Sequence, residues 1–340
     1  MMPGLQKSKN WLRSNSCRNR ASSVEQITLF VTGLVLLYSL NAGAANIAYV
    51  TNQGSNNVSV IDLESSTVTA EIKVGNKPAG VVVAPDNLRV YVSNPESKTV
   101  SVIDSTSNEV IKEVPVGDGP LGIEISPDGK SVYIADWYRH SIAVLDTRTL
   151  KIVRSIKVGL SPAGIVSSPA GRLIYVANRD DNNVSIVDVS NDSIVDTISV
   201  GKAPFGLALS AGEKQLYVAN VQSSSVSVID LESKQVSREI EVGLFPYAIG
   251  YVEKHQRLFV TNQWDNSVSV ISLENYEVIE TIDIGEYPEG IDVHPSGDYV
   301  YVANWFDGTI AVVDSESLEL VQTIKTGEGT RAFGKFILSR

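Results

Sequence analysis

Apolar and polar positions follow one another in the same order seven times along the chain. In the first unit, an apolar run covers 47–50, alternating positions cover 58–61 and 68–74, and a continuous apolar run covers 80–83. Polar turn residues separate these runs. A period of two is typical of a half-exposed β-strand, and a short continuous run is typical of a strand buried on both faces. Each unit therefore predicts four short antiparallel strands.

An aromatic–apolar–small–polar string marks every unit at a constant spacing of 42 residues. The first copy is Tyr49-Val50-Thr51-Asn52 and the last is Tyr301-Val302-Ala303-Asn304. Seven units of 42 residues account for all 294 residues of 47–340. Four strands per unit and seven units predict an all-β, seven-bladed β-propeller. A parallel β-helix is the competing interpretation, but its coils are shorter and stacking would not fix the number at seven.

The phase of the repeat predicts how the ring closes. The continuous apolar strand of each unit should be innermost and the charged, alternating strand outermost. The chain enters the repeats at the second strand of a blade, and it ends in another apolar stretch, 332–338. We expect this C-terminal strand to complete the blade that begins at Ile47, because a closed ring has no open strand edges.

The segment before the repeats has the order of a secretory signal. Residues 1–26 carry five basic side chains and one acidic side chain, an apolar run covers 27–40, and small residues follow at 42–45. This order predicts a signal peptide over 1–45, an exported propeller domain over 46–340 and a periplasmic or extracellular location. An uncleaved anchor is the alternative, although the apolar run is shorter than the roughly 20 residues that span a bilayer.

Charge and sulfur content exclude several kinds of function. The full chain has a net charge of −11, and without its first 45 residues it has a net charge near −15. Such an acidic protein would repel nucleic acid over most of its surface. Cys17 and both methionines precede the repeats. The propeller therefore has no thiolate for a disulfide, an iron–sulfur cluster or covalent haem attachment, and we expect no cofactor.

Four motifs of the repeat resemble the YVTN family of β-propeller repeats. They are Tyr49–Asn52, Val58–Asp62, the Val-Gly-x-x-Pro-x-Gly string at Val116–Gly122, and the Ser-Pro-Asp-Gly turn at Ser126–Gly129. The resemblance covers 47–340 and implies an exported propeller. It leaves the function open, because similar repeats occur in surface-layer proteins, in periplasmic propellers and in the propeller parts of redox enzymes.

Residues that recur in every unit are expected to be structural, so function should lie where the units differ. The loops before each inner strand and after each marker string share one face, which we call the mouth. All three Trp residues of the propeller fall in mouth loops after the marker, and two have an aromatic neighbour. Exposed aromatic side chains favour binding. The predicted contacts are Trp137, Tyr138, Trp264, Trp305 and Phe306; packing at the ends of the blades is the alternative.

The position after each loop proline also varies, and it should face the central channel. Four of its seven occupants are large or charged, and Arg179 from a neighbouring loop could join them. This arrangement predicts binding of a small polar or anionic ligand. The residues concerned are Phe205, Tyr247, Glu289, Arg331 and Arg179. The alternative is a Glu289–Arg331 ion pair that only closes the ring.

Catalytic and metal-binding constellations are not indicated. His255 and His294 belong to turns of the face opposite the mouth, and His140 lies in a mouth loop, so the three histidines do not converge. The turn at 179–183 lacks calcium-ligand spacing. Uniform unit length leaves no lid to exclude water.

We therefore expect a non-catalytic propeller that binds or scaffolds a protein partner or a small ligand at its mouth, without nucleic acid and without a stable membrane span. Two alternatives remain open. One is a periplasmic accessory subunit of a redox dehydrogenase, and the other is a propeller lactonase or lyase that uses Glu289, Arg331 and His140.

The signal-peptide hypothesis predicts that the mature chain begins within a few residues of Ala45, because the first strand begins at Ile47. N-terminal sequencing of the protein from the cell envelope or medium tests this. Met1 at the start of the mature, cell-associated protein would contradict it.

Overall fold

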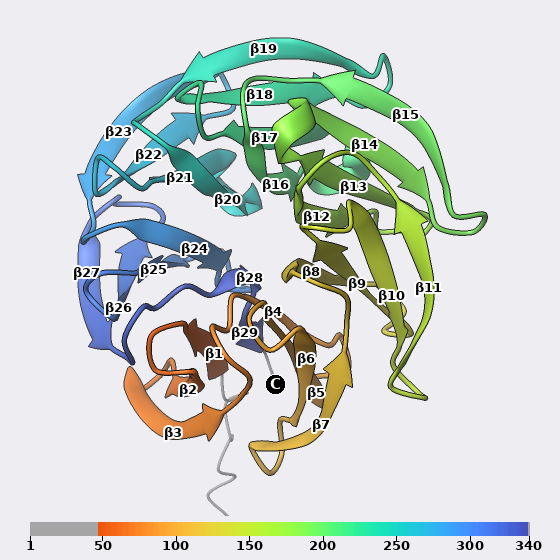
Figure 1. Cartoon of the computed structure of the whole chain (residues 1–340). Coiled ribbons are helices and arrows are strands. Elements are labelled where there is room, and N and C mark those ends of the chain that lie inside the picture. Colours follow the sequence, from red (N-terminus) through yellow and green to blue (C-terminus); the bar gives the residue numbers. More distant parts are fainter. Residues whose placement is uncertain (1–46, 339–340) are drawn as a thin grey trace, which may run out of the picture. The chain divides into compact units, whose positions relative to one another are not determined.

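The strands that the repeat predicts form a ring of seven sheets in the computed structural model, which describes residues 47–338 (Figure 1). Apart from the C-terminal strands added to two of the sheets, neighbouring strands within each blade are antiparallel and follow the chain from the channel outward. The prediction of an all-β, seven-bladed propeller of four-stranded units is confirmed. The predicted signal peptide lies outside the described residues.

The blades are numbered here in chain order. Blade 1 contains β1 (Ile47–Asn52), β2 (Asn57–Asp62), β3 (Thr67–Lys73) and the C-terminal β29 (Ile337–Leu338). Blade 2 contains β4 (Gly80–Val83), β5 (Arg89–Asn94), β6 (Thr99–Asp104), β7 (Glu109–Pro115) and the added β28 (Phe333–Lys335). Blade 3 contains β8 (Pro120–Ile125), β9 (Ser131–Asp136), β10 (Ser141–Asp146) and β11 (Lys151–Lys157). Blade 4 contains β12 (Pro162–Ser167), β13 (Leu173–Asn178), β14 (Asn183–Asp188) and β15 (Ser193–Ser199).

The remaining blades have the same order. Blade 5 contains β16 (Pro204–Leu209), β17 (Gln215–Asn220), β18 (Ser225–Asp230) and β19 (Gln235–Glu241). Blade 6 contains β20 (Pro246–Val252), β21 (Arg257–Asn262), β22 (Ser267–Ser272) and β23 (Glu277–Asp283). Blade 7 contains β24 (Pro288–Val293), β25 (Tyr299–Asn304), β26 (Thr309–Asp314) and β27 (Leu320–Lys325). Three single-turn 3-10 helices lie in loops: η1 (Arg179–Asp181), η2 (Ala211–Glu213) and η3 (Glu253–His255).

The hydrophobic core lies between the blades. In β1 and β2 the central residues are buried, whereas in the outer strand β3 only Ile72 is fully buried. Neighbouring blades share their clusters; Tyr133 and Val144 of blade 3, for example, pack with Ile165 and Val176 of blade 4. Each blade is therefore stabilised by the apolar area that it buries against the next blade. Within residues 47–338, no helix combines the length and the apolar character needed to cross a bilayer.

The recurring polar residues serve the turns, as expected. The fully buried Asn52 donates from Nδ2 to Asn57 Oδ1 at 2.8 Å and to Ser59 Oγ at 2.9 Å, which fixes the hairpin between β1 and β2. Asp62 Oδ1 accepts the Ser65 amide at 2.7 Å, and this hydrogen bond lowers the pKa of Asp62. Such side chains supply the partners that turn backbone otherwise lacks.

Hydrogen bonds also join the blades at the mouth end of the channel. The Thr51 hydroxyl donates to the Ala79 carbonyl at 2.9 Å, and the equivalent Thr261 donates to the Glu289 carbonyl at 3.0 Å. The inner strands approach so closely that a Cβ on Gly122 would lie 1.8 Å from the Ala163 oxygen. Only glycine permits this contact.

The C-terminal segment closes the ring, as predicted, but it does so as two short strands rather than one. β29 pairs antiparallel with β1, and the Tyr49 amide donates to the Phe336 carbonyl at 2.9 Å. Before that, β28 runs parallel to β4. The break lies at Phe336, where the Asp292 carboxylate accepts the amides of Phe336 and Ile337.

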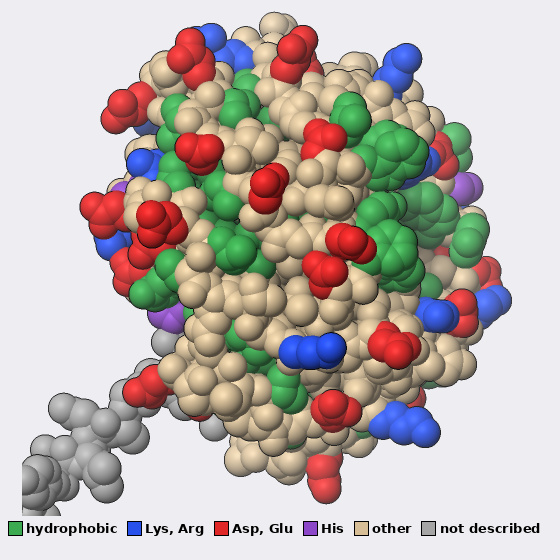
Figure 2. All heavy atoms as spheres, turned by 90° about the vertical axis from the view of Figure 1, so that its left-hand side faces the viewer, with side chains coloured by type: hydrophobic (Ala, Val, Ile, Leu, Met, Phe, Trp, Pro, Cys, Tyr) green, Lys and Arg blue, Asp and Glu red, His purple; other side chains and the backbone are tan. Residues whose placement is uncertain are grey.

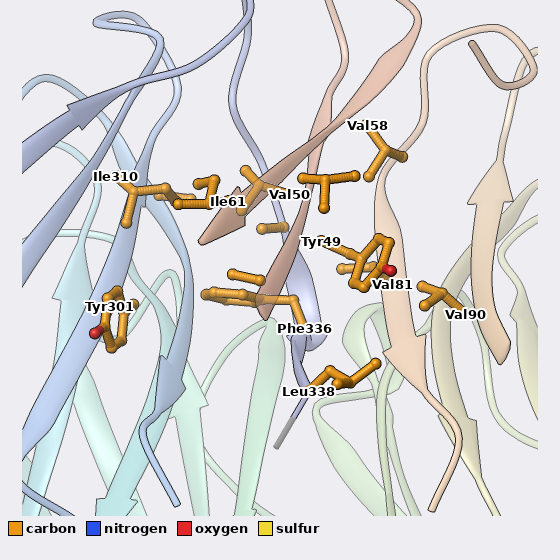
Figure 3. Packing of buried hydrophobic residues seen from close by; sticks show 14 of the residues in the cluster. Tyr49, Val50, Val58, Ile61, Val81, Val90, Tyr301, Ile310, Phe336 and Leu338 are labelled. Atoms are coloured by element: carbon orange, nitrogen blue, oxygen red, sulfur yellow. The ribbon is translucent and has the colours of Figure 1, made fainter. Parts of the chain in front are cut away.

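Apolar packing accompanies this closure. Phe336 and Leu338 are fully buried in one cluster with residues of β1, β4 and blade 7. In Figure 3, Phe336 lies between Tyr301 of β25 and Val81 of β4. The segment therefore joins the first and last blades through side chains as well as through backbone hydrogen bonds.

The closure predicts that Phe336→Ala lowers the free energy of unfolding by about 3–5 kcal/mol, as expected for truncating a fully buried aromatic side chain. Chemical denaturation measures this. Val321→Ala, on the exposed outer strand β27, is the control and should change stability by less than about 0.5 kcal/mol. Equal, small effects of both substitutions would show that the C-terminal segment does not hold the ring.

Candidate functional site

Aromatic side chains close the mouth end of the central channel. The ring centroids of Phe205 and Tyr247 are 4.0 Å apart in a stacked arrangement, and Phe333 packs edge-on against Phe205 at 5.1 Å. All three side chains are buried. They come from β16, β20 and β28, so the C-terminal segment completes the closure of this end. Phe205 and Tyr247 thus face the channel, as predicted, but they fill it.

A buried ion pair lies beside these rings. Arg331 Nε is 2.8 Å from Glu289 Oε2, and the side chains are 16% and 8% exposed. Gln263 Nε2 donates to Glu289 Oε1 at 3.0 Å, and Arg331 donates to the Tyr247 hydroxyl. Burial raises the pKa of the Glu289 carboxyl, and the charge of Arg331 opposes that rise. The two charges therefore pair electrostatically, as in the ring-closing alternative, although Arg331 Nε and Glu289 Oε2 are buried without a hydrogen bond.

Trp137 connects this closure to blade 3. Its ring is 6.4 Å from Phe205, and the Arg179 guanidinium lies 5.8 Å from its centroid. Arg179 also pairs with Asp180 at 2.8 Å, within η1. The neighbouring Tyr138 is 70% exposed and lies against the backbone of Gly119. Of the predicted contacts in blades 3 and 4, Tyr138 is thus the one most available to a partner.

A second group of aromatic side chains is exposed at the mouth of blades 6 and 7. Trp264 is 60% exposed and stacks on Phe245 with a centroid distance of 4.1 Å and an interplanar angle of 8°. Phe306 is 63% exposed and packs edge-on against Tyr287 and Trp305. The Trp305 indole donates to Gln53 of blade 1 at 3.2 Å. Trp264 and Phe306 each present a ring that another side chain holds in place.

Acidic side chains surround this aromatic group. Five exposed carboxylates lie at the mouth ends of blades 6 and 7 (Asp265, Asp283, Glu286, Asp307 and Glu328), whereas the exposed base there is Lys325. No ion pair engages these five carboxylates within residues 47–338. In Figure 2 the outer edges of these blades face the viewer, and hydrophobic side chains gather along the right-hand side with acidic side chains beside them. We call Phe245, Trp264, Tyr287, Trp305, Phe306 and these carboxylates the mouth surface.

The histidines are dispersed in the structure, as expected from the sequence. His140 Nδ1 accepts the Ser161 amide at 3.0 Å in a mouth loop, His255 ends η3, and His294 contacts Ser296 in a turn of the opposite face. In the described part of the chain, no three His, Cys, Asp or Glu residues are grouped closely enough to hold a metal ion.

A hollow of the channel lies at its other end and was not predicted. A cavity of about 390 Å³ is lined by the second halves of the inner strands and by β28. Aliphatic side chains and glycines form much of its wall, and Phe333 separates it from the mouth. Four charged residues also line it: Glu124, Glu253, Asp292 and Lys335.

These charged groups have different tasks. Asp292 Oδ2 accepts the amides of Phe336 and Ile337 at 2.8 and 2.9 Å, and burial raises its pKa to about 6. Glu124 is 5% exposed, and its Oε1 lies 3.5 Å from Lys335 Nζ. The sequence contained a signal for both acids. They occupy one position of the inner strand, 168 residues or four repeats apart, where other units have Val82, Val166, Ala208 and Gly250.

The ring of seven sheets, with its repeated units and its closure by the C-terminal segment, defines a seven-bladed propeller of the type that YVTN-like repeats form. The chain belongs to the YNCE-like beta-propeller family, whose model matches residues 45–169 and 163–261, more than half of the sequence. The resemblance to YVTN-type repeats is thereby confirmed. The model of the cytochrome D1 heme domain matches residues 218–332.

Three solved structures with low sequence identity share the fold. Hydrazine synthase of Kuenenia stuttgartiensis aligns with a TM-score of 0.71 and 23% identity, covering 80% of this chain and 92% of that chain. A functionally unknown protein from Desulfotomaculum acetoxidans aligns with a TM-score of 0.73 and 13% identity, covering 86% of this chain and 100% of that chain. Dihydro-heme d1 dehydrogenase NirN aligns with a TM-score of 0.66 and 16% identity, covering 86% of this chain and 77% of that chain.

A curated relative matches only locally. The PE-PGRS family protein PE_PGRS18 of Mycobacterium tuberculosis is 65% identical over 37 residues. The match covers 11% of this chain and 8% of that protein. It has the length of about one repeat and carries no information on function.

The channel does not fit a haem of the kind that the cytochrome D1 match would imply. Haem iron is held by His, Cys, Met or Tyr side chains. Among these types, only Tyr251 lines the cavity, and its hydroxyl accepts a hydrogen bond from Gln256 at 3.2 Å. At the mouth end, Phe205, Tyr247 and Phe333 occupy the space. The residues that line the channel cavity therefore do not supply a fitting haem ligand.

Removing one partner of the buried ion pair should be costly. We expect Arg331→Ala to lower the free energy of unfolding by about 3–5 kcal/mol at pH 8, because Glu289 is left charged and buried. Since burial raises the pKa of Glu289, lowering the pH protonates it and should shrink the loss. Urea denaturation of this variant and of Glu289→Gln/Arg331→Met, in which both charges are removed, measures the effect. A loss that is the same at pH 5 and pH 8 would contradict it.

Proposed function

We propose that this chain is an exported, non-catalytic binding module that captures a protein partner through the mouth surface of blades 6 and 7. The observation that carries the proposal is the pair of exposed, supported rings, Trp264 on Phe245 and Phe306 on Tyr287. Rigid aromatic side chains bury much area on binding and lose little entropy. The surrounding carboxylates favour a partner that carries basic side chains.

The central part of the mouth has a different role in this proposal. Phe205, Tyr247, Glu289 and Arg331 contact one another and stiffen the ring beneath the binding surface. A rigid support lowers the entropy cost of binding. A lactonase or lyase mechanism that uses Glu289 and Arg331 is less well supported, because each charge is already paired with the other.

A second candidate function is a subunit of a redox assembly. It is favoured by the cytochrome D1 heme domain match and by the fold that the chain shares with hydrazine synthase and NirN. Because the channel lacks a fitting haem ligand, the role here would be to hold a redox partner rather than a haem. Co-purification of the native protein with a chromophore-bearing chain would favour this candidate.

The binding proposal predicts that Trp264→Ala and Phe306→Ala abolish capture of a specific envelope protein and change stability by less than about 1 kcal/mol, since both rings are largely exposed. A pull-down from envelope extract, with the partner identified by mass spectrometry, is compared with a thermal melt of each variant. Raising the salt concentration should weaken the capture.

Leu88→Ala is the matched control, because Leu88 is 56% exposed in a turn of the opposite face. This control should retain the partner. Loss of capture in the control, or retention in both aromatic variants, would contradict the proposal. A large loss of stability with capture intact would leave the rings as packing at the ends of the blades.

A further inference from the structure

We infer that the channel cavity at the end opposite the mouth is a binding site for a small organic ammonium ion with an apolar body. The site is separate from the mouth surface, because Phe333 and its contacts with Phe205 and Tyr247 lie between them. The inference therefore stands independently of the proposed function.

The cavity has the size and character of a small-molecule site. Its volume of about 390 Å³ lies within the range of ligand pockets, roughly 300–1,000 Å³. Side chains such as Ile165, Leu207 and Ile291 supply apolar walls beside the charged groups. An apolar body of four to six carbon atoms, roughly, would replace water against these walls.

Glu124 supplies the charge that would select a cation. Its side chain is buried on the inner strand β8, where burial raises its pKa because the carboxylate has lost water. The Lys335 ammonium is 3.5 Å away, a long distance for an ion pair, and the Lys335 side chain is 63% exposed. Ser167 and this long contact with Lys335 compensate the carboxylate in part, since burial still raises its pKa, and a cation inside the cavity would stabilise it further.

The Lys335 ammonium would compete with the ligand's ammonium for the Glu124 carboxylate. It stands between the channel cavity and a second hollow of about 450 Å³, which Glu124 and Lys335 also line. Its exposed chain can turn toward solvent when an ammonium ion takes its place. The other acids of the lining, Glu253 and Asp292, add negative charge, so the cavity as a whole favours a cation.

Three ligands with one 3-methylbutyl body test the inference: 3-methylbutylamine, 3-methylbutanol and 4-methylpentanoate. Calorimetric titration of the propeller at pH 8 should show binding of the amine at millimolar concentration and no binding of the alcohol or the acid. Glu124→Gln should weaken amine binding by about tenfold or more, because the charged hydrogen bond is lost. Glu96→Gln, which removes an exposed mouth-loop carboxylate, is the charge-matched control and should bind normally.

Lys335→Gln keeps the inference testable if Glu124→Gln fails to fold. Removing the competing ammonium should tighten amine binding. Unchanged amine affinity in a folded Glu124→Gln protein would overturn the inference, and so would weaker amine binding in Lys335→Gln. Binding of the acid in preference to the amine would show instead that Lys335 makes the cavity an anion site. Since these titrations do not use the mouth surface, their failure leaves the proposed function untouched.

Discussion

The structure depends on the closure of its ring by the C-terminal segment. Seven units of equal length could also extend a stack, and here the C-terminal segment closes them into a ring by supplying the inner strand of blade 1. That strand has only two paired residues in β29. Two further contacts therefore help to hold the C-terminal strand in place. Phe336 packs into the core, and the Asp292 carboxylate accepts backbone amides of the segment. A buried acid that accepts three amides is well suited to hold so short a strand.

The same segment also divides the channel into two unequal ends. Phe333 completes the aromatic closure at the mouth, and two residues later Lys335 reaches Glu124 at the other end. The propeller thus has a closed, rigid mouth that presents exposed rings on blades 6 and 7, and a hollow that opens on the opposite face. Binding of a macromolecular partner and of a small ligand would occur at different ends of one rigid scaffold.

The fold could be predicted almost completely from the sequence, because each strand repeats with the same period and the same turn residues. The mouth position of the Trp loops was also predictable. The burial of the predicted site residues could not be predicted, because it depends on which side chains contact one another across the ring. Phe205 and Glu289 face the channel, but only their contacts with Phe333 and Arg331, from the degenerate last unit, show that the mouth is filled. Glu124 and Asp292 interrupt apolar strands. A comparison of equivalent positions in the seven units identifies these two acids, whereas the pattern of apolar residues within one unit does not.

Hydrogen exchange at the closing strands tests the central claim most directly. If the C-terminal segment holds the ring, the amides of Tyr49, Phe336 and Ile337 should exchange as slowly as those of the buried strand β17 in blade 5, through unfolding of the whole propeller. Fast exchange at these three amides, while β17 stays protected, would show that the ring opens at blade 1 and would contradict the account.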